Sequence, residues 1–551
     1  METNVNKNNL VVWVSGLLAA LLAALFFSLT WNTGDDARYY ALAKSLALGK
    51  GYVAAFLPDS PPEMLTPPGH VLLLFTVMKL FGTGVLPGKV FVALTFVLAS
   101  IVCSLWTRRL YPNDPFRALA AVIMGMFLLG ILTMSCWYMA EMSYLFFSLL
   151  ILYLYERWKE ALSWPRVAAL GLLTGYTYLV RSVGCSLFAG LFLFFLLKRR
   201  WRNLAVFTLG FSAIAGLWIL RNWLVVGAFD TYIPHFANMT GNADGMRYPW
   251  MRIFRDISVA FPKYFGTDLP SSMFYQLLDG RNLFGLLHIG FLAVPVRLGI
   301  LGLIALGFLS RLRRPQPMDL YWILYWLVIC SPPFPPQGIW YVYPVLPLAA
   351  VYLFEGITLL GALAARAGLP RFGSSGARGL IVLCAGYALA TALWGGGVHA
   401  VKEIPRWQYA PWDPNRYPFF ENPYLDRWGK FVEAALWVGS NRPPETVVAS
   451  RQPQHVHIFT GQHGWRYDQP EVKGSNLWEQ INLMAAKRPT VLIEDAFEAV
   501  PGAPFSYGTS HWALRALFEA HANDFVMIYE TGEPVTRVWE LKTAPARDPD
   551  P

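Results

Sequence analysis

The chain has 551 residues, of which 55% are hydrophobic, with a mean hydropathy of +0.38 and a formal net charge of +10. Several apolar runs reach the ~17 residues that a membrane-spanning helix needs, which excludes a soluble globular protein of this size. The basic residues cluster in short loops between these runs, so orientation in a membrane explains the charge better than nucleic-acid binding. We therefore predict an α-helical, multi-pass protein of the plasma or inner membrane, with the lipid bilayer and no nucleic acid as a partner.

The first apolar run extends from Leu10 to Trp31 and ends in an acidic patch. It is longer than a signal-peptide core and no small-residue cleavage site follows it, so we interpret it as an uncleaved anchor with its N-terminus inside. Asp35 and Asp36 follow it directly, with Tyr39 close behind. Adjacent carboxylates at a membrane surface either cap a surface helix or serve a site, because burying them unpaired is costly.

Two short helices are predicted between the first and second membrane spans. The first is an amphipathic stretch over about 36–49. The second covers 67–82, which is apolar but short and contains His70 and Lys79. We predict that this second helix lies along the outer face without crossing the membrane. If it crossed, every later basic cluster would change sides.

The basic clusters fix the predicted path of the chain when all of them are placed in the cytoplasm. They lie at 108–109, 157–159, 198–202, 311–314 and 366–378. The predicted spans cover about 10–31, 86–107, 116–135, 142–156, 166–181, 184–198, 203–226, 285–310, 318–332, 341–365 and 379–397, with a long outer loop over 227–283. Residues 1–399 therefore form a predicted domain of about eleven transmembrane helices.

Residues 400–551 are polar and rich in Trp and Tyr, and they form a second, extracytoplasmic predicted domain. Strand-like runs alternate with helical runs, which indicates a small α/β domain. The predicted strands are 446–450, 455–459, 490–494, 525–529 and 535–541, and the predicted helices are 426–440, 475–487 and 512–522. There is no G-x-G-x-x-G fingerprint for a nucleotide, and none of the five cysteines has metal-ligand spacing. His455 and His457 alternate on a predicted strand, and we interpret them as structural.

The order of these parts resembles a family of integral-membrane glycosyltransferases that take a sugar from a polyprenyl-phosphate carrier. This is the GT-C superfold, with the protein O-mannosyltransferases of glycosyltransferase family 39 and the bacterial lipid A aminoarabinose transferase. The resemblance covers nearly the whole chain and no single motif carries it. The matching residues are Asp35-Asp36 with Tyr39, Ala43 to Gly51, Pro67-Pro68-Gly69, Glu141, Arg181, Arg221-Asn222 and Tyr341 to Pro347.

The resemblance implies transfer of a hexose or pentose to an acceptor hydroxyl on a glycan, lipid or protein at the outer face. A carboxylate near the acceptor can take its proton, and cations can stabilise the leaving phosphate. By resemblance, Asp35 is the general base, assisted by Asp36 and Glu141. A divalent metal held by Asp35 and Glu141 stays open. Arg181 and Arg221 are the implied ligands of the donor phosphate, and the implied substrate-loop residues are Tyr39, Pro67, Pro68 and Tyr341.

Two departures from the family concern basic residues that could contact the phosphate. Thr66 stands just before the prolines and Trp340 just before Tyr341, where the family often has a basic residue. Both departures shift the predicted phosphate contact towards Arg181. Plainer interpretations stay open, with Glu141 as an interfacial carboxylate without a role and Arg181 reaching to the headgroups.

Two other classes of function compete with the enzyme. A transporter or flippase of lipid-linked sugars would favour charged residues in mid-span and broken helices in matching halves. The chain has few of the former and no visible halves. The second alternative is a non-catalytic membrane scaffold with an outer binding domain, against which the intact Asp35 argues.

Overall fold

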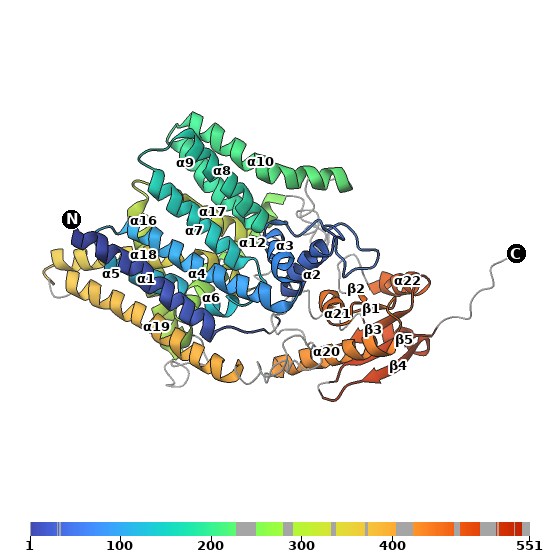
Figure 1. Cartoon of the computed structure of the whole chain (residues 1–551). Helices are drawn as coiled ribbons and strands as arrows, with labels where there is room; N and C mark the ends of the chain where they lie inside the picture. The colour runs from blue at the N-terminus through green and yellow to red at the C-terminus, as the bar shows by residue number, and fades with distance from the viewer. Residues whose placement is uncertain are drawn as a thin grey trace.

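The structure is a computed structural model of the chain. Figure 1 shows a bundle of long helices, two shorter helices at one end of it, and a small sheet beyond them. The described residues are 2–29, 31, 35–227, 249–278, 290–331, 338–369, 373–403, 423–467, 474–495, 514, 517–533 and 535–542.

Each predicted span overlaps at least one helix of the bundle. Five helical segments in the described part are long and apolar enough to cross a membrane, namely Val85–Leu110, Trp201–Val225, Gly290–Arg311, Ile339–Arg366 and Ser374–Val401. The chain is thus a mainly helical membrane protein, while the total of about eleven spans stays a prediction. The helices of the bundle are α1 Glu2–Leu25, α4 Val85–Leu110, α5 Pro115–Met126, α7 Glu141–Trp158, α8 Trp164–Val180, α9 Cys185–Leu197, α10 Trp201–Val226, α16 Ala293–Arg311, α17 Pro317–Cys330, α18 Leu346–Arg366 and α19 Ser374–Glu403.

The structure differs from the prediction at three of these places. α1 begins and ends earlier than the apolar run. The predicted span 116–135 is interrupted, because Leu128 is extended and separates α5 from a short α6, Leu129–Met134. The predicted outer loop contains α12 Pro249–Phe261, a π-helical turn Pro262–Asp268, α13 Leu269–Met273 and α14 Tyr275–Leu278. Hydrophobicity averaged over a span does not detect such breaks and short helices.

Glycines allow backbones to meet directly inside the bundle. A Cβ on Gly307 of α16 would lie 1.9 Å from the carbonyl oxygen of Tyr352 of α18. A Cβ on Gly356 of α18 would lie equally close, at 1.9 Å, to the carbonyl oxygen of Leu303. Small residues at such crossings are typical of membrane helices, where close van der Waals packing drives association.

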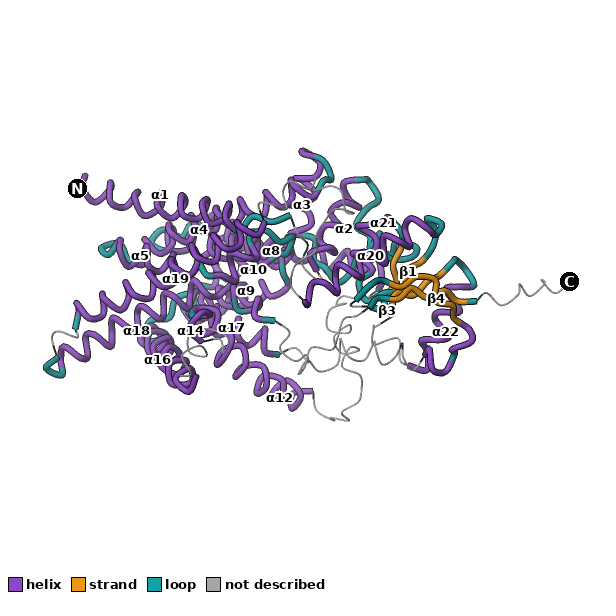
Figure 2. The backbone as a smooth tube through the Cα atoms, turned by 90° about the horizontal axis from the view of Figure 1, so that it is seen from below, coloured by secondary structure: helices purple, strands orange, loops and turns teal. Residues whose placement is uncertain are grey.

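The two predicted surface helices are present as α2 Asp35–Ala47 and α3 Gly69–Phe81. They pack against each other at the end of the bundle, on the side of the sheet (Figures 1 and 2). Gly69 begins α3 against the end of α8, where a Cβ would lie 2.6 Å from the backbone of Leu179. The pair therefore forms a layer between the bundle and the C-terminal unit, here called the α2–α3 layer.

The C-terminal unit contains a five-stranded sheet in the order β2-β1-β3-β5-β4. β2, β1 and β3 are parallel, with Val448 opposite both Gly464 and Val491, while β5 is antiparallel to β3 and β4. The α/β character is thus confirmed. The strands are β1 Val447–Ala449, β2 His463–Trp465, β3 Thr490–Glu494, β4 Phe525–Glu530 and β5 Arg537–Leu541, and the helices are α20 Pro423–Asn441, α21 Pro453–Thr460 and α22 Gly474–Ala485.

The predicted strand over 455–459 is wrong, since these residues belong to α21. Pro453 in the first turn and the left-handed Gly461 after the last turn bound this helix. His455 and His457 therefore lie on a helix, and the strand in this region is β2, which was not predicted. Of the predicted helix 512–522, residues 514 and 517–520 are helical and others lie outside the described residues.

The C-terminal unit rests on the α2–α3 layer. One apolar cluster joins Leu42 of α2, Leu74 of α3, Phe431 of α20 and Val448 of β1. In the loop between α2 and α3, the carbonyl oxygen of Phe56 accepts a hydrogen bond from the backbone of Gly464 over 2.7 Å. The sheet therefore covers the layer from the side opposite to the bundle.

The loop between α2 and α3 is held by a buried carboxylate. Both oxygens of Glu63 accept hydrogen bonds from Arg38 Nη2, each over 2.7 Å, and Oε1 also accepts from the backbone of Leu65 and Thr66, each over 2.9 Å. Arg38 Nε donates to Thr66 Oγ1 over 2.9 Å. Burial raises the pKa of Glu63, but the charge of Arg38 and these hydrogen bonds outweigh burial and hold it below the ordinary 4.5.

We expect this carboxylate to make the layer sensitive to acid. Its lowered pKa means that its stabilisation is complete above pH ~4.5 and is lost as the pH falls through the lower folded-state value. At neutral pH, Glu63→Gln should lose about 1.5–3 kcal/mol, as for hydrogen bonds to charged groups. The midpoint temperatures of thermal unfolding of wild type and Glu63→Gln should differ at neutral pH, and this difference should become smaller below pH ~4.5. A constant difference at all pH values would contradict this assignment.

Candidate active site

The end of the bundle beneath the α2–α3 layer holds a buried ion pair. Asp36 and Lys89 have fully buried side chains, with Lys89 Nζ 3.5 Å from Asp36 Oδ2. The other oxygen, Oδ1, accepts a hydrogen bond from the backbone N–H of Tyr138. Lys89 Nζ also lies 5.0 Å from the ring centre of Tyr138 and 5.5 Å from that of Trp31. Asp36 thereby fixes the start of α2 to α4 and to the turn before α7.

Asp35 differs from its neighbour in being exposed at the first residue of α2. A carboxylate in the first turn of a helix is favoured by the helix dipole, and Asp35 is the first helical residue, one position after the N-cap position expected for a capping Asp. Arg38, one turn further along, feels the charge of Asp35. Asp35 is thus a solvent-accessible carboxylate on a helix that Asp36 holds in place.

The second buried pair joins α7 to the end of α8. Glu141 is the first residue of α7 and its side chain is 1% exposed. It contacts Nη1 of Arg181, which directly follows α8 and is 16% exposed. An unpaired charge at this depth would be costly, and the guanidinium compensates the charge of Glu141, although neither carboxylate oxygen has a geometrically sound hydrogen bond among the described residues. The interfacial-carboxylate interpretation of Glu141 therefore does not describe its surroundings.

Aromatic rings and a histidine surround this second pair. The Arg181 guanidinium carbon lies 5.4 Å from the ring centre of Tyr341, and the Tyr325 hydroxyl donates to the carbonyl oxygen of Tyr341 over 2.6 Å. The Tyr39 ring meets His70 edge-on, with 5.1 Å between centres. Tyr39 and Tyr341 also interact electrostatically with Arg181. Tyr39 of α2 and Tyr341 ahead of α18 are thus brought to Arg181 from distant parts of the sequence.

His70 is a fully buried, neutral residue of this cluster. Burial lowers its pKa to about 4; a hydrogen bond to Tyr138 raises it and the Arg181 charge lowers it. Nε2 lies 2.8 Å from the carbonyl oxygen of Tyr138, and Nδ1 lies 3.0 Å from Ser143 Oγ. Because a carbonyl only accepts, the proton is on Nε2, and Nδ1 accepts from the Ser143 hydroxyl. His70 therefore ties α3 to α7 without adding charge.

Arg221, near the end of α10, contacts the α2–α3 loop. Its Nη1 donates to the carbonyl oxygen of Glu63 over 2.5 Å and to Asn222 Oδ1 over 2.9 Å. Its guanidinium also lies over the rings of Trp218 and Tyr52, 5.1 and 5.8 Å from their centres. Arg221 is part of the scaffold of this loop, so its bonds to protein compete with any contact to a phosphate.

The two prolines shape the start of α3. Pro68 precedes the first residue of α3, and Pro67 and Pro68 are both half-buried. The Tyr176 hydroxyl of α8 donates to the carbonyl oxygen of Gly69 over 2.9 Å. The Pro-Pro-Gly turn therefore delivers α3 to the end of α8, next to Arg181.

The acids do not fit a shared metal site. Glu141 faces Arg181, Asp36 faces Lys89, and within the described ranges no group of three His, Cys, Asp or Glu side chains could hold an ion. We therefore derive no step through a metal.

The structure brings most of the predicted residues to one end of the bundle. Asp35, Asp36 and Tyr39 lie on α2, which packs on α3, while Glu141, Arg181 and Tyr341 form one contact group. The residues missed by the sequence analysis are partners of these groups. They are Trp31, Arg38, Glu63, Lys89 and Tyr325; the single Lys in an otherwise apolar start of α4 was the one available signal.

Comparison with known proteins gives structural neighbours only. No protein-family model matches the chain. No curated protein sequence matches it either.

The solved structures that resemble the chain include membrane glycosyltransferases. ArnT from Cupriavidus metallidurans in the apo state has a TM-score of 0.55 and 14% identity over 96% of this chain and 97% of that one. The same protein bound to undecaprenyl phosphate gives 0.54, with the same identity and coverage. An oligosaccharyltransferase from Archaeoglobus fulgidus, tethered with an acceptor peptide containing the NVT sequon, has a TM-score of 0.51 and 15% identity over 97% of this chain and 74% of that one. The resemblance expected from the sequence is confirmed at the level of the fold: this chain has the GT-C fold of integral-membrane glycosyltransferases.

Proposed function

We propose that the chain transfers a sugar from a polyprenyl-phosphate carrier to an acceptor hydroxyl, at the end of the bundle covered by the α2–α3 layer. The fold supports this proposal, since one structural neighbour is described with bound undecaprenyl phosphate and another with an acceptor peptide. The arrangement of acids and cations at this end of the bundle agrees with the needs of glycosyl transfer. The acceptor is a glycan, a lipid or a protein.

The observation that carries the proposal is the different state of the three candidate acids. Asp36 and Glu141 are buried in ion pairs, whereas Asp35 is exposed. A general base must reach the acceptor hydroxyl and be free to take its proton. Asp35 meets this requirement, while Asp36 holds α2 in place and Glu141 orients Arg181.

Arg181 is the proposed ligand of the donor phosphate. Its guanidinium is paired with Glu141 on one side and remains partly exposed. A guanidinium presents donors on several sides, so the pairing leaves others for a phosphate oxygen. Tyr39, Tyr341, Pro67 and Pro68 then line the place where the donor binds, and Arg221 acts through the loop that it holds.

We further propose that the α2–α3 layer and the C-terminal unit lie outside the membrane, on the side opposite to the basic clusters. Single cysteines at Gly84, just after α3, and at Ser440, near the end of α20, occupy exposed positions. Both should react with a membrane-impermeant maleimide in intact cells. A cysteine at the exposed Arg313 should react only after permeabilisation. A cytoplasmic Gly84 or Ser440 site would remove the proposed location of the active site.

Asp35→Asn should reduce sugar transfer about 10²–10⁴-fold, because it keeps the shape of the side chain and removes its basicity. The measurement is turnover with a polyprenyl-phosphate sugar in purified protein, after thermal unfolding has shown that the variant is folded. Glu445→Gln, at an exposed acid before β1, is the matched control and should retain activity. If folded Asp35→Asn has near wild-type turnover, Asp35 is not the general base, and the helix-cap role is the one that remains.

Arg181→Lys should retain part of the donor binding and Arg181→Ala should lose most of it, because a point charge replaces a guanidinium fork only in part. The KM for the polyprenyl-phosphate sugar should rise more than the KM for the acceptor. Glu141→Gln keeps a hydrogen-bonding side chain next to Arg181 and should have a smaller effect on donor KM. Unchanged donor kinetics in folded Arg181→Ala would reject the phosphate contact.

A further inference from the structure

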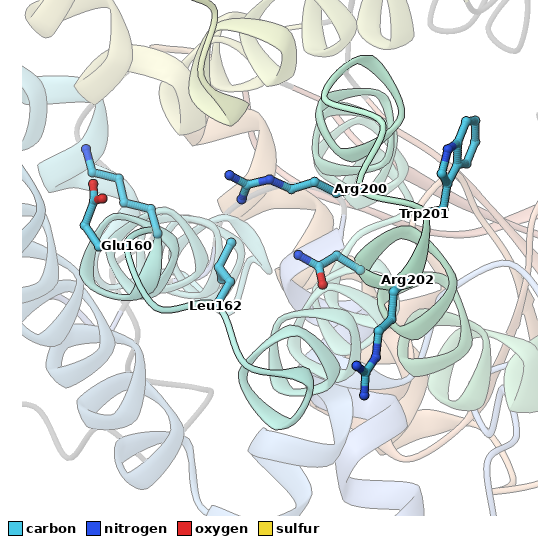
Figure 3. A pocket seen from close by; sticks show the side chains of 7 residues that line it. Glu160, Leu162, Arg200, Trp201 and Arg202 are labelled. Carbon is cyan, nitrogen blue, oxygen red and sulfur yellow. The ribbon is translucent and has the colours of Figure 1, made fainter.

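A second polar site lies at the opposite end of the bundle. A pocket of about 450 Å³ is lined by residues of the α7–α8 turn and of the start of α10. Figure 3 shows Arg200 reaching from the α10 side towards the turn that carries Glu160 and Leu162. The lining residues are Lys159, Glu160, Leu162, Arg200, Trp201, Arg202 and Asn203.

The charge of this pocket is positive. It contains three basic side chains against the single acid Glu160. Lys159 is paired with Glu156 over 2.8 Å. No ion-pair partner is found for Arg200 or Arg202 among the residues with described placement. Two guanidinium groups are therefore available to an anion from outside the chain.

The backbone at this pocket also favours an anion. Arg200 is the N-cap residue of α10, and Trp201, Arg202 and Asn203 form its first turn. No side chain caps this end, so the first N–H groups of the helix keep their donors. These donors and the helix dipole attract negative charge to the start of α10, where Arg200 reaches towards the α7–α8 turn and Arg202 points in another direction from the same turn of helix (Figure 3).

The position of the pocket along the bundle is that of a membrane surface. α7 runs from Glu141 at the candidate active site to Trp158 beside the pocket, and its 18 residues cover about 27 Å at 1.5 Å per residue. That length is close to the ~30 Å hydrocarbon core of a bilayer. Trp164 and Trp201, at the starts of α8 and α10, are each 61% exposed, as is typical of tryptophans at the interface.

We propose that this pocket binds the phosphate headgroup of an anionic phospholipid in the leaflet opposite the candidate active site. The basic lining, the uncapped helix end and the interfacial depth all match a phosphodiester whose acyl chains stay beside α8 and α10. The exposed apolar side chains Leu172 and Leu209 on these helices provide a surface for the chains. The proposal does not depend on the reaction at the other end.

The test compares lipid retention by purified protein in native mass spectrometry, with phosphatidylglycerol and phosphatidylcholine as probes. Wild type should retain phosphatidylglycerol preferentially. Arg200→Gln/Arg202→Gln should weaken this retention about 10–30-fold, from roughly 1 kcal/mol for each basic residue near a membrane surface. Arg313→Gln/Arg314→Gln removes two exposed arginines that do not line the pocket, and this variant should retain the lipid as wild type does.

Three outcomes would overturn the proposal. These are unchanged retention in the pocket variant, equal loss in both double variants, and displacement of the lipid by inorganic phosphate with the same dependence on Arg200 and Arg202. The last outcome would identify a site for free phosphate. If the double variant does not fold, the single variant Arg200→Gln is the second variant, and it should weaken phosphatidylglycerol retention by about 5-fold.

Discussion

The cost of removing charged groups from water governs the end of the bundle where the candidate active site lies. A carboxylate or ammonium group buried alone would lose several kcal/mol, so each must meet an opposite charge in good geometry. Asp36 meets Lys89, Glu141 meets Arg181, and Glu63 meets Arg38. Since the pairs join separate elements, compensating the charges also positions α2 on α4, α7 on the end of α8, and the loop between α2 and α3 on α2. The exposed Asp35 owes its fixed place to the buried residue beside it.

The same constraint acts at the opposite end of the bundle with a different result. Arg117 pairs with Glu355 over 3.1 Å and joins the start of α5 to α18, and Arg311 pairs with Asp319 over 3.1 Å and joins the end of α16 to the start of α17. In each of these pairs the two charges compensate each other within the protein. The arginines at the start of α10 have no such partner among the described residues, and they face a pocket instead of a neighbouring helix. The two ends of the bundle thus differ in how much charge is left for ligands.

Thr66 and Trp340 stand at the two positions where the related family often has a basic residue, and both contact neighbouring side chains. Thr66 Oγ1 accepts a hydrogen bond from Arg38 Nε over 2.9 Å, so a guanidinium of α2 lies beside the position where the family often has its own cation. Trp340 stacks with Tyr341, with 6.3 Å between ring centres, next to Arg181. Fold similarity alone would not assign the phosphate contact.

The sequence by itself determined the class of the protein. Segments that lie in lipid must be apolar, and charged residues stay in the loops in water, so the pattern of apolar runs and basic loops identifies a membrane protein. It also determined the positions of most helices, the presence of the two short helices α2 and α3, and the α/β character of the C-terminal unit. It misassigned residues 455–459 as a strand, because their polar and apolar residues alternate as they do in strands. A proline and a glycine bound this segment, and it forms a short helix. The partners of the acids were decided only by the tertiary structure. Lys89 is 53 positions from Asp36, and Arg181 is 40 positions from Glu141. Charge pairing acts through space, so which carboxylate is buried and which remains free depends on helix packing that no local pattern encodes.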